Sequence, residues 1–138
     1  MFETTLLTSL QGLPAFISYF ILAVILLGVF IRIYTWVTPH DEIALIKNDN
    51  LAAASAFGGA ILGFSLPLAS AIEHSQSIAD CAIWGVVALI VQVLTFSVLR
   101  LVLKELPQRI ERGELAAGLF SGAVAVAIGL INAACMTY

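Results

Sequence analysis

Four stretches of this sequence run without a charged residue or a histidine for about the length of a bilayer-crossing helix. They are residues 13–31, 51–72, 81–99 and 115–138. A membrane-spanning α-helix needs about 20 mostly apolar residues, so each stretch qualifies. The chain is 61% hydrophobic and only 11% charged, whereas a soluble domain carries about 25% charged residues. The sequence therefore predicts an all-α membrane protein with four transmembrane helices.

Short connections leave little room for a soluble domain, so we expect one integral-membrane domain over residues 1–138. The first helix is expected to continue past Arg32. The N-terminal segment lacks the Lys and Arg residues and the A-x-A-like site of a secretory signal, so we expect it to be retained. The expected spans are about 13–37, 51–72, 81–99 and 115–137.

The basic residues predict the orientation of the chain. All six Lys and Arg residues flank the first and third connections, and the N-terminal tail and the second connection have none. Basic residues concentrate in cytoplasmic loops, so we expect the first and third connections in the cytoplasm and both termini outside it. The six residues are Arg32, Lys47, Arg100, Lys104, Arg109 and Arg112.

An internal repeat is visible in the second and fourth stretches. LAAASAFGGAILGFSLPLASA, which begins at Leu51, aligns without gaps on LAAGLFSGAVAVAIGLINAAC, which begins at Leu115. Each unit would contain two spanning helices joined by a basic connection, so the repeat would be parallel rather than inverted. We expect repeat units over about 13–73 and 80–138.

The two basic connections are expected to form short helices at the membrane surface, or alternatively to dock a cytoplasmic partner. In TPHDEIALIK, Thr38 is a candidate N-cap, Pro39 suits the first helical position and Asp41 completes a capping-box-like pattern. Asn50 suits the cap of the second span, and Glu114 suits the positive end of the fourth.

Small residues predict how the helices pack. Helices in a bilayer associate where small side chains let their backbones approach closely, and such residues recur four apart in the second and fourth spans. We expect these spans to form an inner pair, with the first and third facing lipid. The same small faces could join subunits, so we also expect a homo-oligomer. The packing candidates are Ala54, Gly58, Gly59, Gly63, Gly118, Gly122 and Gly129.

Three residues inside the spans stand out. Pro67 frees the backbone carbonyl of Gly63 and predicts a break in the second span. Asn132 lies at almost the same depth in the fourth span, where it could bond that broken backbone or Ser70, or line a polar path. Gln92 lies near the bilayer centre, where an unpaired amide is costly. We expect it to bond another helix, with pore lining as the alternative.

No reaction, metal or cofactor is predicted. Cys81 and Cys135 lack metal-site spacing and are expected to be packing residues, although a disulfide stays open. Glu73, His74 and Asp80 form a solvated outer rim by this interpretation, with a metal or pH-sensing role unsupported by spacing. No Asp, Glu, Lys, Arg or His lies in the core of any span, whereas proton-coupled carriers normally hold an ionisable group inside the membrane. No basic patch predicts nucleic-acid binding, and we expect no enzyme.

With these features in place, the chain resembles the YjfL family of small bacterial inner-membrane proteins, a domain family of unknown function. The resemblance covers nearly the whole chain. It implies a multi-pass inner-membrane protein and brings no activity and no catalytic residues. It is carried by NDNLAAASAFGGAILGFSLPLASAI, EHSQSIADCAIWGVVALIVQVL, RIERGELAAGLF and GLINAACMTY.

Two function hypotheses follow. The first is a non-enzymatic structural or partner subunit of a membrane complex, in contact with the lipid bilayer and with its own copies or another membrane protein. The second is a small homo-oligomeric channel or transport pathway lined by the second and fourth spans, with Gln92 and Asn132 as polar contacts.

Overall fold

The computed structural model describes residues 1–39 and 41–136, and within these residues it contains helices and no strand. Four helices are long and apolar enough to cross a membrane, which confirms the predicted all-α, four-span class. The helices are α1 (Phe2–Leu10), α2 (Leu13–Val37), α3 (Glu42–Lys47), α4 (Leu51–His74), α5 (Ile78–Val102), α6 (Leu106–Glu111) and α7 (Leu115–Cys135).

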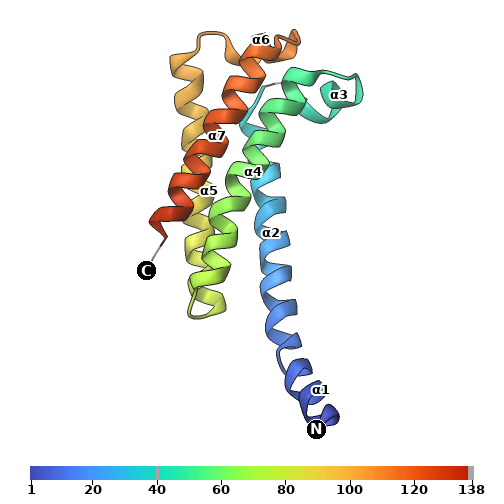
Figure 1. Cartoon of the computed structure of the whole chain (residues 1–138). Coiled ribbons are helices and arrows are strands. Elements are labelled where there is room, and N and C mark those ends of the chain that lie inside the picture. The colour runs from blue at the N-terminus through green and yellow to red at the C-terminus, as the bar shows by residue number, and fades with distance from the viewer. Residues whose placement is uncertain (40, 137–138) are drawn as a thin grey trace.

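The central helix of the bundle is α4, which contacts α2, α5 and α7. Figure 1 shows α4 and α7 running side by side, with α3 and α6 gathered at one end and the α4–α5 turn at the other. Within the most apolar window of each helix, 56% of α4 is buried but only 33% of α7. The prediction of an inner pair therefore applies fully only to α4, because α7 keeps one exposed face.

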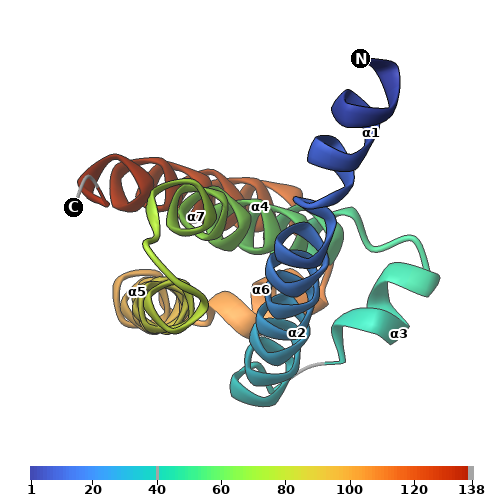
Figure 2. The same ribbon diagram turned by 90° about the horizontal axis from the view of Figure 1, so that it is seen from below.

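No element was expected over residues 2–10, where the structure places α1. This helix contains no buried residue, and it extends α2 away from the bundle (Figures 1 and 2). Gly12 and Pro14 separate the two helices. Pro14 begins a helix well because its missing N–H would have no partner in the first turn.

The α3 helix begins later than its sequence predicts. Thr38 caps the end of α2 instead, where its hydroxyl donates to Tyr34 O at 3.0 Å. Asp41 is the N-cap of α3, and its side chain accepts from the backbone N–H of Ala44 at 3.2 Å. A carboxylate three residues before an exposed N–H is a strong cap, so Asp41 sets the start at Glu42 and Pro39 lies outside the helix.

Matching turns precede α4 and α7. Asp49 and Gly113 both adopt positive φ angles, 60° and 81°. The N–H of Asn50 donates to Leu45 O, and the N–H of Glu114 donates to Arg109 O in the same arrangement. Glycine adopts this backbone conformation without a steric penalty, and Asp tolerates it better than most residues. Each turn reverses the chain from a short helix into a spanning helix.

Aromatic rings fill the part of the bundle nearest α3 and α6. Phe30 of α2 stacks on Phe64 of α4 with 4.8 Å between ring centroids. Tyr34 stacks on Phe57 at 5.3 Å and meets Phe96 of α5 edge-on at 5.2 Å. These pairs join three long helices at one level. The fully buried residues of α2, Leu26, Phe30 and Tyr34, all lie in its C-terminal half. Tyr19, Leu22 and Ala23 of the other half also pack against the core, but they are only partly buried.

Candidate functional site

The α4–α7 contact is built from glycines whose missing side chains let the two backbones touch. A Cβ on Gly59 would overlap the backbone of Gly122, and one on Gly118 would overlap the backbone of Ala52. Backbone atoms cannot move aside as a flexible side chain can. The close approach of the two helices therefore requires glycine at positions 59 and 118. It also allows Cα–H···O contacts between the helices.

The carbonyl that Pro67 frees lies inside this same contact. Pro67 cannot donate to Gly63 O, and a Cβ on Gly129 would collide with that oxygen. The backbone of Gly129 thus covers the freed carbonyl directly. Side chains, waters or neighbouring helices commonly satisfy such groups in membrane helices, and here a glycine backbone of α7 takes that position.

Asn132 does not take that role in the described part of the chain. Its Nδ2 atom is buried and has no hydrogen-bond partner among the described residues. Ser70 instead links the helices, because its hydroxyl donates to Ala133 O of α7 at 3.0 Å.

Gln92 joins α5 to α7 in the bundle interior. Its side chain is buried, and its Nε2 atom donates to Ala125 O at 3.1 Å. Ala125 O also lies against Gly63, so three helices meet at this amide. Beside it is a cavity of about 10 Å³, lined in part by Tyr34 and Ser121. That volume corresponds to about one water molecule.

The predicted packing residues separate into two groups. Gly59, Gly63, Gly118, Gly122 and Gly129 all lie in the α4–α7 contact. Gly58 differs from the prediction, since a Cβ there would meet nothing within 4 Å. Ala54 lies one turn before Gly58 on the same side of α4, and Ala54 is half-buried. One residue corresponds to about 100° around a helix, so Gly58 points away from the face that Gly59 presents.

The cysteines occupy different environments. Both are free thiols; Cys81 is buried and Cys135 is exposed. Cys135 therefore does not match the expectation of a packing residue, because its side chain is exposed. Among residues 1–39 and 41–136, no group of three or more His, Cys, Asp or Glu is placed to hold a metal ion.

Asn50 connects the two short-helix regions, a role beyond its predicted capping. Its Oδ1 atom accepts from the N–H of Ala53 at 3.0 Å, which caps α4. Its Nδ2 atom donates to the carbonyls of Ile110 and Glu111 in α6 at 3.0 and 3.2 Å. The sequence signal was limited to the cap, because the second contact depends on how the two connections meet in space.

At the equivalent start of α7, Glu114 makes no capping hydrogen bond. It pairs instead with Arg112 at 2.8 Å and with Arg109 at 3.4 Å. The hydrogen bond from Arg112 holds the pKa of the Glu114 carboxyl below its ordinary value, and it raises the pKa of Arg112. This exposed cluster keeps the chain charged where it enters the membrane.

Two surface hollows were not predicted. One lies along α2 over Gly28, and the other lies between the end of α2 and the start of α3. Both are lined by Arg32. The sequence marked Arg32 only as an orientation signal, and the hollows depend on Gly28, Trp36 and Asp41 lying near it in the fold.

The fold and these contacts define a class, a small multi-pass membrane protein in which three spanning helices pack around the fourth. The chain belongs to the family described as Domain of Unknown Function (DUF350), whose model matches residues 8–136. This confirms the family resemblance drawn from the sequence motifs.

Curated relatives cover nearly the same length. The chain is 45% identical over 129 residues to the UPF0719 inner membrane protein YjfL of Escherichia coli (strain K12), covering 94% of this chain and 98% of the relative. It is 27% identical over 119 residues to the UPF0719 transmembrane protein YshE of Bacillus subtilis (strain 168), covering 85% and 89%. No solved structure matches the chain.

Proposed function

We propose that this protein is a non-enzymatic component of a bacterial inner membrane that works by assembling with copies of itself or with another membrane protein. The observation that supports this most is an apolar groove of about 570 Å³ on the outer side of the α4–α7 pair. The groove is lined by Ser55, Gly59, Leu62, Leu119, Gly122, Ala123, Val126, Ala127 and Leu130.

The walls and floor of this groove suit a further helix. Gly59 and Gly122 leave its floor without side chains, and Ala123 and Ala127 lie one turn apart on its exposed wall. Small residues let a neighbouring backbone approach, which is the main way in which helices associate inside lipid. We infer that the occupant is a second copy of this chain, in a closed homo-oligomer.

The subunit count in lipid nanodiscs, measured by native mass spectrometry, tests this proposal. The parent protein should give a defined oligomer, and the double variant Ala123→Phe/Ala127→Phe should shift it to the monomer by filling the groove. Ala15→Phe provides a matched control, because Ala15 is an exposed alanine on α2. A monomeric parent that also recovers no membrane partner in mild detergent would overturn the proposal.

The channel hypothesis draws less support from the interior of one subunit. Gln92 uses its amide N–H on Ala125 O, and the cavity beside it is about 10 Å³. A pathway would therefore have to run between subunits, with Asn132 as its polar contact. Flux through vesicles that is lost in Asn132→Leu, with assembly unchanged, would favour this alternative.

We infer that both termini are periplasmic. The short helices α3 and α6, whose connections carry the basic residues, lie at one end of the bundle (Figure 1). The α4–α5 turn, which contains no Lys or Arg, lies at the opposite end. Basic residues favour the cytoplasmic side. A reporter enzyme that works only in the periplasm should be active when it is fused after residue 138. Activity of a reporter that works only in the cytoplasm, fused at the same position, would contradict the orientation.

We also infer that the chain is a parallel repeat of two helix pairs. The order of a long helix, a six-residue helix and a second long helix occurs twice, as α2–α3–α4 and α5–α6–α7. The turns at Asp49 and Gly113 make equivalent hydrogen bonds. Expressed together, residues 1–74 and 75–138 should reconstitute the bundle, and failure to associate would count against independent repeat units.

A further inference from the structure

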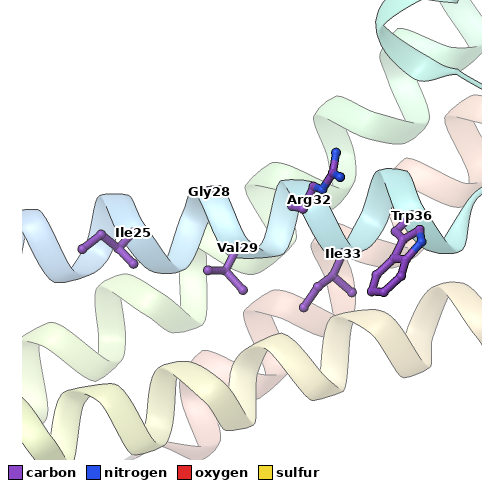
Figure 3. A pocket seen from close by; sticks show the side chains of 6 residues that line it. All are labelled: Ile25, Gly28, Val29, Arg32, Ile33 and Trp36. Carbon is purple, nitrogen blue, oxygen red and sulfur yellow. The ribbon is translucent and has the colours of Figure 1, made fainter.

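The hollow along α2 is lined mostly by apolar side chains. It has a volume of about 520 Å³ and is lined by Ile25, Gly28, Val29, Arg32, Ile33 and Trp36. Figure 3 shows apolar side chains projecting from successive turns of α2, with Arg32 projecting from the other edge of the helix. A Cβ on Gly28 would meet nothing within 4 Å. The glycine therefore serves no helix contact in the described structure, and it deepens the hollow.

Arg32 stands where a lipid headgroup would begin. It lies one turn beyond Gly28, near the C-terminal end of α2, and Trp36 beside it is 83% exposed. Tryptophan and arginine at the end of a spanning helix lie at headgroup depth. Arg32 is exposed and forms no ion pair with a described residue. Its guanidinium is free to bind a phosphate through parallel N–H donors.

A second, polar hollow continues from Arg32 toward α3. It has a volume of about 420 Å³, and its lining includes Arg32, Thr35 and two acidic residues, of which Asp41 is exposed and Glu42 is buried. Asp41 is exposed, and one of its oxygens caps α3 through Ala44 N. The Arg32 cation thus lies where the two hollows meet, and the exposed carboxylate of Asp41 lines the polar one. A headgroup that matches this order has a phosphate first and an ammonium beyond it.

We propose that α2 and α3 bind one phosphatidylethanolamine molecule. Its acyl chain lies over Gly28, its phosphate contacts Arg32, and its primary ammonium donates to Asp41. Phosphatidylglycerol offers the phosphate without the ammonium, and phosphatidylcholine has a quaternary ammonium that cannot donate a hydrogen bond. The site therefore selects among headgroups. If the orientation proposed above is correct, the bound lipid belongs to the cytoplasmic leaflet.

Native mass spectrometry of the full chain, with each of the three lipids added at equal concentration and with identical acyl chains, tests the proposal. The parent should retain phosphatidylethanolamine about tenfold more than phosphatidylcholine. Arg32→Gln should lower retention of phosphatidylethanolamine and phosphatidylglycerol about tenfold, as expected for loss of a charged hydrogen bond. Lys47→Gln removes an exposed cation of α3 that is not among the lining residues of either hollow, and it should leave retention unchanged.

Two further variants separate the parts of the site. Asp41→Asn should lower retention of phosphatidylethanolamine and leave that of phosphatidylglycerol unchanged. Gly28→Leu should lower retention of both by filling the groove, whereas Gly58→Leu fills an equally open position on α4 and should not. Because Asp41→Asn changes the ratio of two lipids in one sample, it remains informative even if Arg32→Gln folds poorly.

Three outcomes would overturn the proposal. The first is equal retention of all three lipids by the parent, which would indicate non-specific contact with the bilayer. The second is an Asp41→Asn ratio identical to that of the parent. The third is a cross-link between Cys residues introduced at Val29 in two copies of the chain, which would show that a second subunit covers the hollow.

Discussion

The α4–α7 pair and the α1–α2 segment are both apolar, yet they differ in what their side chains contact. In the pair, Gly63 and Gly129 bring two backbones into direct contact. Along α1 and the first half of α2, no residue before Leu26 is buried. Hydrophobicity alone thus does not distinguish a helix that packs on protein from one that faces lipid. The difference lies in the size of the side chains and in whether the small ones lie on the same face of the helix.

The largest effect is expected from a side chain placed between the paired backbones. Gly129→Leu should lower the free energy of unfolding by about 3 kcal/mol, because overpacking against backbone cannot be relieved by a side-chain shift. Gly58→Leu should change it by less than about 0.5 kcal/mol, as for an open surface position. Reversible unfolding in mixed detergent micelles, followed by circular dichroism, measures both. Equal losses would show that the pair is not the tighter region.

A smaller effect separates the two halves of α2. Phe30→Ala removes a buried ring stacked on Phe64, and the resulting cavity should cost about 2 kcal/mol. Phe20→Ala removes an exposed ring and should cost less than about 0.5 kcal/mol. The same unfolding assay applies. A larger loss for Phe20→Ala would indicate that the outer half of α2 has a protein partner.

The hydrogen bond of Gln92 should contribute less than either packing contact. Gln92→Leu should cost about 0.6 kcal/mol, the average for interhelical hydrogen bonds measured in a membrane bundle. Ser97→Ala is the control, since the Ser97 hydroxyl donates to Val93 O within its own helix. A change that abolishes folding would mean that Gln92 organises the bundle interior rather than adding one contact.

The smallest effect concerns the pH dependence of Glu114. Its pKa is lowered in the folded state by the hydrogen bond from Arg112. The stabilisation is therefore present above the unfolded-state pKa and is lost as the pH falls through the folded-state value. Carbon-13 NMR should show the Glu114 carboxyl titrating below its ordinary range, and Arg112→Gln should move it upward. An unchanged titration would contradict the pairing.

The sequence predicted the parts of the fold that follow from composition and spacing. Uncharged stretches predicted the four spans, and an amide in the membrane has to find a partner, so a contact for Gln92 was expected. The sequence could not decide between Gly58 and Gly59, because both belong to four-residue rows and only the tertiary partner fixes which row packs. The same reason explains why Ser70 rather than Asn132 bridges α4 and α7.

The surface hollows could not be predicted for a different reason. Gly28 is an ordinary apolar-span residue in the sequence, and its openness depends on what neighbouring helices leave uncovered. Asp41 approaches Arg32 only because the chain turns at the end of α2 and α3 begins at Glu42. The residue pattern predicted that the helix starts near Pro39, which would have placed the Asp41 carboxylate inside the helix.

Because the fully buried residues of α2 lie in its C-terminal half, the rest of the helix, which packs against the core only through partly buried residues such as Tyr19, is freer to tilt. Leu26 is the first buried residue, and Leu13 lies about 20 Å further along the axis. A tilt of about 10°, well within the range that spanning helices adopt, would move the far end sideways by more than 3 Å. The N-terminal helix can therefore follow changes in bilayer thickness while the glycine-packed pair keeps its geometry.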